Sequence, residues 1–334
     1  MVSDSPAAAV AGGQLLRAGA STATRQAVTP DARRRLQLVL AAIWLLDGVL
    51  QYQSFMFGRG FSQMLAGVAP GNPAIIADPI TWAAKIVAQH PVPTNAAFAT
   101  IQVLIGLGIA GRRTIRPALA ASIVWAVAVW WFGEGLGGIL NGGASPVNGA
   151  PGAVIIYALL AVLLWPVADG DRSDRPPFVA ALPVGAATAK VLWMVLWGSL
   201  AYFAVTAANR TAQGLHDMVA GMGGGEPGWL SAVNRGAADV LAHNGLAASI
   251  VLAVLLGVVA VGVFLPLPLS RAAIVLAIVI ALLIWVVGQD FGTILAGGAT
   301  DPNSGLLLAV LAAAYWPASA VARRPTDSTE ALAS

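Results

Sequence analysis

Long runs of hydrophobic residues alternate with short polar segments along most of the chain. A helix needs about 20 apolar residues to cross the hydrocarbon core of a bilayer, and runs of about this length recur throughout the sequence. The spans expected from them are Leu36–Phe57, Asn95–Gly111, Ala118–Leu140, Ala150–Ala168, Ala186–Ala208, Gly245–Leu265, Ala272–Leu295 and Gly305–Val321. The pattern predicts an all-α membrane protein with eight transmembrane helices.

The composition indicates the same class. Of the 334 residues, 58% are hydrophobic and 10% are charged, whereas a soluble domain has roughly 45–50% apolar and about 25% charged residues. These values exclude a soluble globular protein, a disordered chain and a nucleic-acid-binding domain. The chain has no cysteine, which excludes disulfides, thiol redox chemistry and Cys-ligated metal centres. No cofactor or metal is predicted, and the bilayer is the expected environment.

Two sequence stretches in the two halves of the chain resemble each other. Residues 137–144 read GGILNGGA and residues 292–299 read GTILAGGA, and each is followed by an apolar run that ends in Trp-Pro, at 165–166 and 316–317. Further matching landmarks occur in the same order, so we predict an internal duplication. Each half holds four expected spans, an even number. The halves therefore enter the membrane in the same direction, as parallel four-helix repeats.

The remaining segments complete the expected domain organisation. The predicted parts are a disordered cytoplasmic tail (1–35), the first repeat (36–168), a charged cytoplasmic linker (169–185), the second repeat (186–321) and a second tail (322–334). Within each repeat a segment of intermediate polarity with helical periodicity follows the first span, at 58–94 and 209–244. These segments predict short amphipathic helices on the outer face. They either pack the ends of the bundle or cover a cavity or docking surface.

Basic residues are distributed unevenly over the loops. With a cytoplasmic N-terminus, the inner segments hold Arg17, Arg25, Arg33, Arg34, Arg35, Arg112, Arg113, Arg116, Arg172, Arg175, Arg271, Arg323 and Arg324. The outer segments hold only Arg59, Lys85, Arg210 and Arg235. Because cytoplasmic loops are enriched in Lys and Arg, we expect a plasma-membrane protein with both termini in the cytoplasm.

Three acidic residues lie within the expected spans, where an ionisable group is costly. Asp47 is near the middle of the first span, while Glu134 and Asp290 lie toward the outer ends of the third and seventh. Asp47 either bonds to a neighbouring span, for example to Gln102 or Tyr157, or forms a proton-relay or cation site. Leu200 aligns with Asp47, so the first half is the better candidate for an active half.

The glycines around Glu134 permit a break in the helix, so its carboxylate either lines a cavity or ends the span near water. His90 and His243 precede the second and sixth spans. They are a candidate outer-face site for metal binding or proton transfer, although a histidine at the start of a helix more often has a capping or interfacial role.

The first half also resembles a known family. The stretches IWLLDGVLQ, AQHP, IQVLIGLGIAG and RRTIRPALAAS are similar to the DoxX/DoxD-like four-helix membrane modules, which include the small subunit of thiosulfate:quinone oxidoreductase. The resemblance covers about residues 36–168, and 186–318 more faintly. Duplicated integral membrane proteins of actinobacteria are a closer likeness. The resemblance implies the architecture and a redox-membrane association, and it carries over no catalytic residue.

Three functions are consistent with these observations. The first is an accessory, non-enzymatic membrane module that supports a partner membrane protein. The second is a transporter for a small solute or ion, proton-coupled, with its site at the repeat interface near Asp47 and Glu134. The third is a quinone-linked redox subunit.

Overall fold

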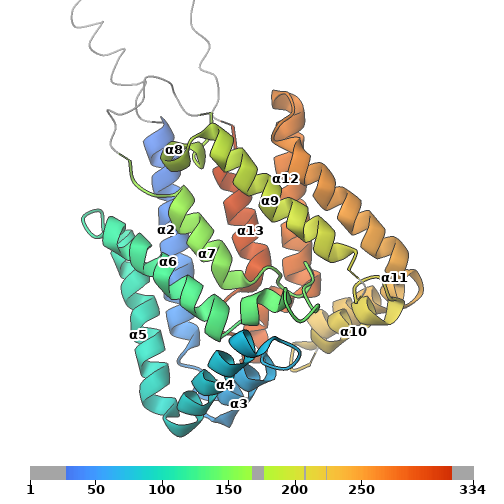
Figure 1. The fold of residues 1–334 in the computed structure, drawn as a ribbon. Coiled ribbons are helices and arrows are strands. Elements are labelled where there is room, and N and C mark those ends of the chain that lie inside the picture. Colours follow the sequence, from blue (N-terminus) through green and yellow to red (C-terminus); the bar gives the residue numbers. More distant parts are fainter. Residues whose placement is uncertain (1–27, 168–176, 207, 223, 318–334) are drawn as a thin grey trace, which may run out of the picture.

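The computed structural model describes residues 28–167, 177–206, 208–222 and 224–317, and the regular elements in that part of the chain are helices (Figure 1). The first half forms η1 (Ser54–Phe57), η2 (Gly135–Gly138), α2 (Val28–Leu50), α3 (Arg59–Gly67), α4 (Ala74–Gln89), α5 (Pro91–Ala110), α6 (Ile115–Phe132) and α7 (Ala153–Leu163). The second half forms α8 (Ala181–Val184), α9 (Ala186–Ala204), α10 (Ala212–Met222), α11 (Gly228–Gly262), α12 (Leu267–Leu283), η3 (Ile284–Gly288), η4 (Asp290–Gly292), η5 (Ile294–Ala296) and α13 (Asn303–Ala314).

The helical class is confirmed. Within the described residues, α5, α6, α9, α11 and α12 extended by η3 are long and apolar enough to cross a membrane. Helices α7 and α13 are also apolar but have only 11 and 12 residues. The chain is thus an all-α protein with several helices suited to a bilayer.

The first helix begins earlier than the apolar run predicts. Helix α2 starts at Val28, so residues 28–35, expected in a disordered tail, are helical. Alanine and arginine are good helix formers and Pro30 lies in the first turn, where proline is tolerated. The helix ends at Leu50, and Ser54–Phe57 forms a separate 3₁₀ turn instead of extending the span. Residues 1–27 lie outside the described part.

Glycine-rich segments shorten the spans that precede them. Helix α6 ends at Phe132 instead of the expected Leu140, because Gly135, Leu136, Gly137 and Gly138 all have left-handed backbone angles. Such angles are incompatible with a continuing right-handed helix. In the second half α12 gives way to the π-turn η3 and then to the 3₁₀ turns η4 and η5. The short helices α7 and α13 begin only after these irregular segments.

The second outer segment is continuous with the span that follows it. Helix α11 runs through the boundary expected at Gly245 and bends at Asn244, where φ is −131°. In the first half the corresponding break at His90 separates α4 from α5, and Pro91 follows it. Proline lacks an N–H and disfavours the helical region for the residue before it, so the first half breaks where the second half only bends.

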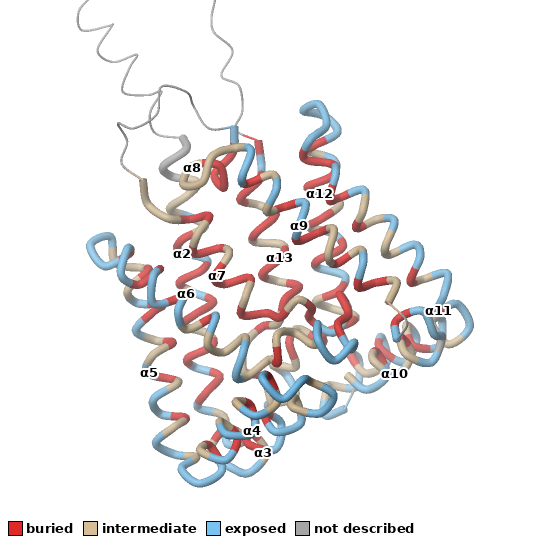
Figure 2. The backbone as a smooth tube through the Cα atoms, in the orientation of Figure 1, coloured by how far each residue is buried: buried red, intermediate tan, exposed pale blue. Residues whose placement is uncertain are grey.

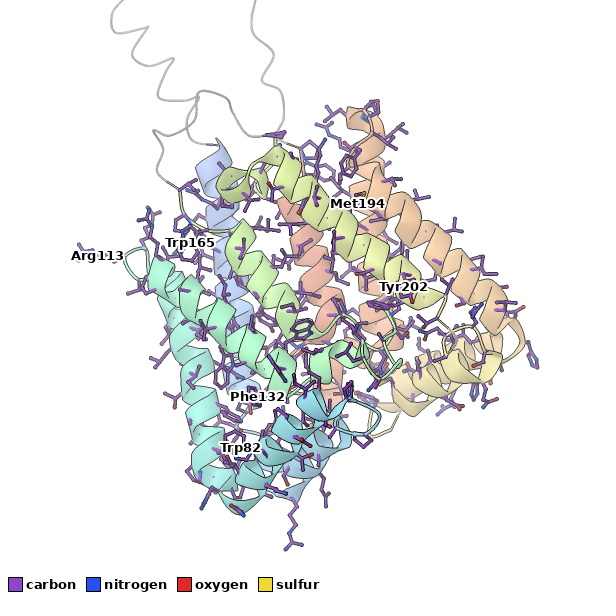
Figure 3. The ribbon with its side chains drawn as sticks, in the orientation of Figure 1. Trp82, Arg113, Phe132, Trp165, Met194 and Tyr202 are labelled. Carbon is purple, nitrogen blue, oxygen red and sulfur yellow. The ribbon has the colours of Figure 1, made fainter. Side chains whose placement is uncertain are left out.

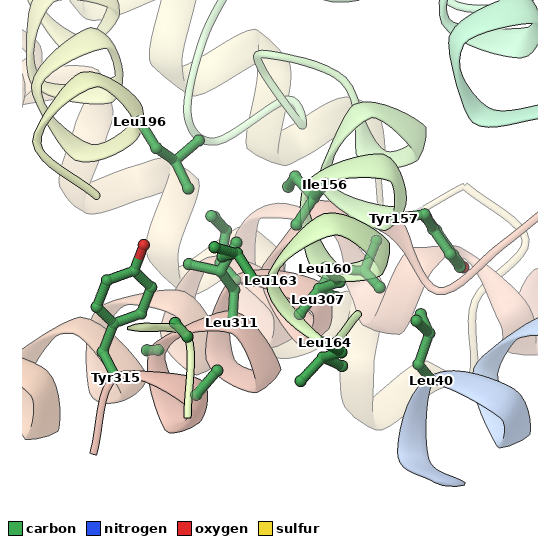
Figure 4. Close-up of a cluster of buried hydrophobic side chains, with 14 of the residues drawn as sticks. Leu40, Ile156, Tyr157, Leu160, Leu163, Leu164, Leu196, Leu307, Leu311 and Tyr315 are labelled. Atoms are coloured by element: carbon green, nitrogen blue, oxygen red, sulfur yellow. The ribbon is translucent and has the colours of Figure 1, made fainter. Parts of the chain in front are cut away.

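Helices α7 and α13 occupy the centre of the bundle (Figure 1). Leu160 and Leu163 of α7 and Leu307 and Leu311 of α13 are fully buried and lie in one cluster (Figure 4). Figure 2 shows buried positions on these central helices and exposed positions along the outer ones. The exposed side of the outer helices is rich in large apolar side chains, including Leu104, Val124, Val195, Val254 and Leu283. An apolar exterior of this kind is suited to contact with lipid.

The end of the bundle that holds α3, α4 and α10 lies opposite the start of α2 and the end of α13 (Figure 1). These three helices form where the sequence predicts amphipathic helices. The expected linker 169–185 is described only from residue 177. There Phe178 is buried and stacks on Tyr315 at 5.2 Å, so this part packs on the bundle instead of forming a polar connection.

Two side-chain hydrogen bonds join the halves near the glycine-rich segments. The amide of Gln53, after the first helix of the first half, donates to the carbonyl of Ala299 at 3.2 Å. The amide of Asn209, after the first long helix of the second half, donates to the carbonyl of Ala144 at 3.0 Å. Each half therefore holds the glycine-rich segment of the other.

Candidate functional site

Asp47, expected near the middle of a span, lies on α2 with 2% of its surface exposed. Its Oδ2 accepts a hydrogen bond of 2.7 Å from the hydroxyl of Tyr157 on α7. The ring of Trp44, on the same face of α2, packs 4.5 Å from that of Tyr157. The Trp44 Nε1 donates to Ser122 Oγ on α6 at 3.0 Å. Helix α7 thus holds this carboxylate directly and α6 holds the neighbouring Trp44. The bond to Tyr157 is one of the two alternatives that the sequence left open for Asp47.

Glu134 lies just beyond the end of α6, at the break that the glycines permit. Its Oε1 accepts hydrogen bonds from the backbone N–H groups of Ala153 at 3.0 Å and Val154 at 3.3 Å. The carboxylate therefore caps the amino end of α7, where the helix dipole favours negative charge. Trp130 supports the same turn by donating from Nε1 to the carbonyl of Pro151 at 2.6 Å.

Asp301 is a third carboxylate at this place, and it comes from the second half of the chain. Its Oδ1 accepts from the backbone N–H of Asn303 at 2.7 Å and its Oδ2 accepts from Thr300 Oγ1 at 2.8 Å. It was not among the carboxylates expected from the sequence. A Thr-Asp-Pro-Asn stretch before a helix signals a cap, but its approach to the first half depends on how the halves pack.

A cavity of about 380 Å³ contains the side chains of Asp47, Glu134 and Asp301 in its lining. It lies among α2, α3, α4, α5 and α6, with the start of α7 and the segment before α13 closing it. Its aromatic lining consists of Trp44, Phe61, Trp82, Phe98, Trp125 and Phe132. The structure therefore brings together two of the three predicted carboxylates, Asp47 and Glu134. Of the two alternatives expected for Glu134, the structure shows the one in which its carboxylate lines a cavity.

Several acceptor atoms at this cavity have no hydrogen-bond partner among the described residues. They are Oδ1 of Asp47, Oε2 of Glu134 and the side-chain oxygens of Gln51 and Gln102, all buried. Buried polar atoms in proteins are nearly always paired, and an unpaired one costs about 1–3 kcal/mol. The cavity thus presents a set of acceptors that a ligand with donor groups would satisfy.

The carboxyls in the connecting segments have altered acidities. Glu134 and Asp301 lie outside the spanning helices. Burial first, and then the nearby charge of Asp301, raise the pKa of Glu134 to about 8, although the two backbone N–H bonds oppose the shift. Burial likewise raises the pKa of Asp301 above its usual value. A carboxyl with the pKa of Glu134 holds and releases its proton near neutral pH.

Asp290 lies apart from this cavity. It is fully buried, and its Oδ1 accepts a short hydrogen bond from the amide of Asn234 on α11. The residue before it, Gln289, takes the place that Glu134 has in the first half. Its Oε1 accepts from the N–H of Gly305 on α13 at 2.9 Å. Leu200, which aligns with Asp47, is fully buried. The second half thus repeats the helix cap with an uncharged side chain.

The two candidate outer-face histidines do not meet the carboxylates. His90 and His243 are both exposed, next to the break before α5 and the bend in α11. Neither belongs to the lining of the cavity. In the part of the chain that the structure describes, no group of three or more His, Asp or Glu side chains is arranged to hold a metal ion.

Comparison with known proteins identifies no relative of this chain. No protein-family model matches it, and neither a curated protein nor a solved structure is found to be similar. The resemblance to DoxX/DoxD-like modules therefore stays an expectation, and the function is argued from the cavity.

Proposed function

We propose that this chain is a multi-pass membrane transporter that binds a small solute in the cavity and exchanges it for a proton held by Asp47 and Glu134. The observation that carries the proposal is the cavity itself, in which these carboxylates share an apolar, aromatic-lined space with unpaired acceptor atoms. Ionisable side chains inside a membrane protein are costly and mark ion pathways and proton relays. A volume of about 380 Å³ lies at the small end of ligand pockets, which span roughly 300–1,000 Å³.

The proposal includes an architecture of eight crossings in two parallel four-helix repeats. Helices α2, α7 and α13 would add to the five long apolar helices, and the irregular segments before α7 and α13 would connect them toward the end of the bundle that holds α3 and α4. The reciprocal contacts of Gln53 with Ala299 and of Asn209 with Ala144 support a duplication. The equivalent helix caps by Glu134 and Gln289 support it as well.

The proposed orientation places both termini in the cytoplasm of a plasma-membrane protein. Arg113 lies at the connection between α5 and α6, at the opposite end of the bundle from α3 and α4 (Figure 3). Its neighbours in sequence, Arg112 and Arg116, and the run Arg33 to Arg35 at the start of α2 belong to the same end. An accumulation of arginines on one side of the membrane supports a cytoplasmic assignment for that side.

The unpaired acceptors also argue against the quinone-linked alternative. The carbonyl oxygens of a quinone accept hydrogen bonds, and they would face the oxygens of Asp47 and Glu134. Two donors of this region are already engaged, since Trp44 donates to Ser122 and Tyr157 to Asp47. When the carboxyls are ionised, a quinone would bury acceptors against acceptors, which is unfavourable, so the ionised cavity suits a ligand with donor groups better than a quinone.

The test is proton movement in proteoliposomes that enclose a pH-sensitive dye. The purified protein is challenged with a panel of small aryl-alkyl amines, alcohols and carboxylates, one compound at a time. We expect at least one compound to drive protons across the bilayer, and Asp47→Asn to abolish the signal. Asp290→Asn is the matched control, because it changes a buried carboxylate outside the cavity and should retain the signal.

Two results would contradict the proposal. One is that no compound of the panel moves protons through the wild-type protein. The other is that Asp47→Asn and Asp290→Asn retain equal activity. In either case the accessory role would gain support, and co-purification of a partner membrane protein in mild detergent would examine that role directly.

A further inference from the structure

We infer that the cavity takes a lipophilic monocation, a protonated amine attached to a compact aromatic or branched apolar body. The inference rests on the proposed function, because it names the substrate class of the same site. Four features of the cavity carry it: the sign of its charges, its unpaired acceptors, its aromatic walls and the position of its rim.

The charged side chains that line the cavity have one sign. Asp47, Glu134 and Asp301 contribute carboxyl groups, and among the lining residues none is basic. An anionic solute would bury its charge beside carboxyls with no counter-charge, which is strongly unfavourable. An ammonium ion that binds there takes the place of a proton: the carboxyl O–H bond breaks, the proton leaves to water, and the carboxylate pairs with the ammonium. Charge is conserved in this exchange.

The unpaired acceptors select for hydrogen-bond donors. The carboxylate oxygens Asp47 Oδ1 and Glu134 Oε2 cannot be donors when ionised, and both are buried without a partner among the described residues. Asp47 is 2% exposed. An ammonium group carries up to three N–H donors and no acceptor, so it can satisfy more than one of these oxygens. A neutral alcohol offers one donor and leaves most of them unpaired.

The walls fit the apolar body of such a cation. Phe98 on α5 and Trp125 on α6 meet edge to face at 5.4 Å, and Trp44 presents its ring beside Asp47. Aromatic faces attract cations, most strongly where water is excluded, and they also bury apolar carbon. The cavity therefore combines carboxyl groups that can pair with an ammonium and aromatic side chains that can pack against its apolar body.

The rim of the cavity is lined by exposed apolar side chains. Trp82 on α4 and Phe132 at the end of α6 line the cavity and are 60% and 38% exposed. Their rings lie 6.4 Å apart, on the side of α6 that faces α4 (Figure 3). Met64 on α3, 42% exposed, belongs to the same rim. A solute that passes this apolar rim is favoured by an apolar body of its own, which accounts for the lipophilic character.

The experiment compares three probes of similar size on the full-length protein in lipid nanodiscs by isothermal titration calorimetry. The probes are 2-phenylethylammonium, neutral 2-phenylethanol and anionic 3-phenylpropanoate. We expect only the ammonium to bind, with at least tenfold loss in Asp47→Asn and unchanged binding in Asp290→Asn. Titration in buffers with different ionisation enthalpies should show release of up to one proton for each ammonium bound.

The outcomes separate this inference from the proposed function. Equal binding of the alcohol, preferred binding of the carboxylate, or no binding of the ammonium would overturn the inference. If the alcohol or the carboxylate drives protons in proteoliposomes, transport stands and the cation class is wrong. If the ammonium binds as expected but moves no protons, the ligand class stands and transport is wrong. The comparison requires that Asp47→Asn is folded, which an unchanged gel-filtration profile would show. Asp47→Glu keeps the negative charge and should recover part of the binding that Asp47→Asn loses.

Discussion

The Tyr157 hydroxyl on α7 donates a 2.7 Å hydrogen bond to Asp47 on α2, so a residue of the central helix fixes the carboxylate that faces the cavity. Only Oδ2 is engaged by this bond, and Oδ1 stays without a partner among the described residues. One oxygen is thereby used for positioning and the other is left for a ligand.

Replacement of Tyr157 by phenylalanine removes that bond without creating a large cavity. We expect the free energy of unfolding to fall by about 1–3 kcal/mol, because a buried carboxyl is left with fewer hydrogen-bond partners. The measurement is the thermal unfolding midpoint in detergent, followed by tryptophan fluorescence. Tyr202→Phe on α9 is the matched control, since Tyr202 is 67% exposed. An equal shift in both variants would show that the Tyr157–Asp47 bond contributes nothing specific.

Glu134 combines two roles that substitutions can separate. In Glu134→Gln the amide oxygen still accepts from the N–H groups of Ala153 and Val154, as Gln289 does for Gly305 in the second half. We expect this variant to fold with nearly wild-type stability and to lose proton coupling. Glu134→Ala loses the cap as well, which costs about 0.5–2 kcal/mol.

The corresponding measurement is the unfolding midpoint of both variants, together with the proteoliposome assay. If Glu134→Gln is as unstable as Glu134→Ala, the negative charge and not the acceptor stabilises α7, and the comparison with Gln289 fails.

Gly152 holds the turn between Glu134 and α7. Its φ is +114°, and a Cβ there would come within 2.3 Å of Glu134 Oε2 and 2.6 Å of the Trp130 ring. We therefore expect Gly152→Ala to destabilise the protein by about 1–3 kcal/mol, since a strained backbone and a clash coincide. Gly257→Ala in the interior of α11 is the control: no atom lies within 4 Å of the added methyl, and alanine favours a helix. A stable Gly152→Ala protein would mean that this turn rearranges freely.

The acidity of Glu134 gives stability a defined pH dependence. Its pKa is raised from the usual 4.5 to about 8, so between these values the folded state holds a proton that the unfolded state releases. Stability from this group is therefore greatest at low pH and declines as the pH rises from about 5 to about 8. Glu134→Gln should weaken the dependence of the unfolding midpoint on pH over this range. The dependence that remains is expected from Asp301, whose pKa is also raised. A profile identical to that of the wild type would contradict the assignment.

Much of the fold follows from the sequence, because apolar runs of spanning length determine helices wherever the backbone is free of breakers. The ends of helices were predicted less well. Helix α6 stops at Phe132 because several consecutive residues after it take left-handed angles, and apolar residues such as Leu136 and Ile139 hide that break in a hydrophobicity pattern. The continuity of α11 through Asn244 was missed because polarity changes there while the backbone only bends.

The site was predicted in part. Asp47 and Glu134 are conspicuous as acidic residues in apolar runs, and the structure places both at one cavity. Asp301 was missed because it joins them only through packing of the second half on the first, a contact between segments far apart in the sequence. Asp290 was grouped with Glu134 only because both lie at a similar depth in their expected spans. In the structure the Asp290 carboxylate accepts a hydrogen bond from Asn234 and lies outside the cavity. Depth in a membrane does not specify which neighbour a side chain faces.

The most direct test of the central claim, that Asp47 and Glu134 form a ligand-accessible site, is labelling with a hydrophobic carbodiimide. This reagent modifies protonated carboxyls that it can reach from an apolar phase, and mass spectrometry identifies the modified residue. We predict modification of Asp47 or Glu134 in the membrane-embedded protein, protection by 2-phenylethylammonium, and little modification of the fully buried Asp290. Labelling of Asp290 in preference to both, or labelling of Asp47 and Glu134 that the ammonium leaves unchanged, would contradict the account.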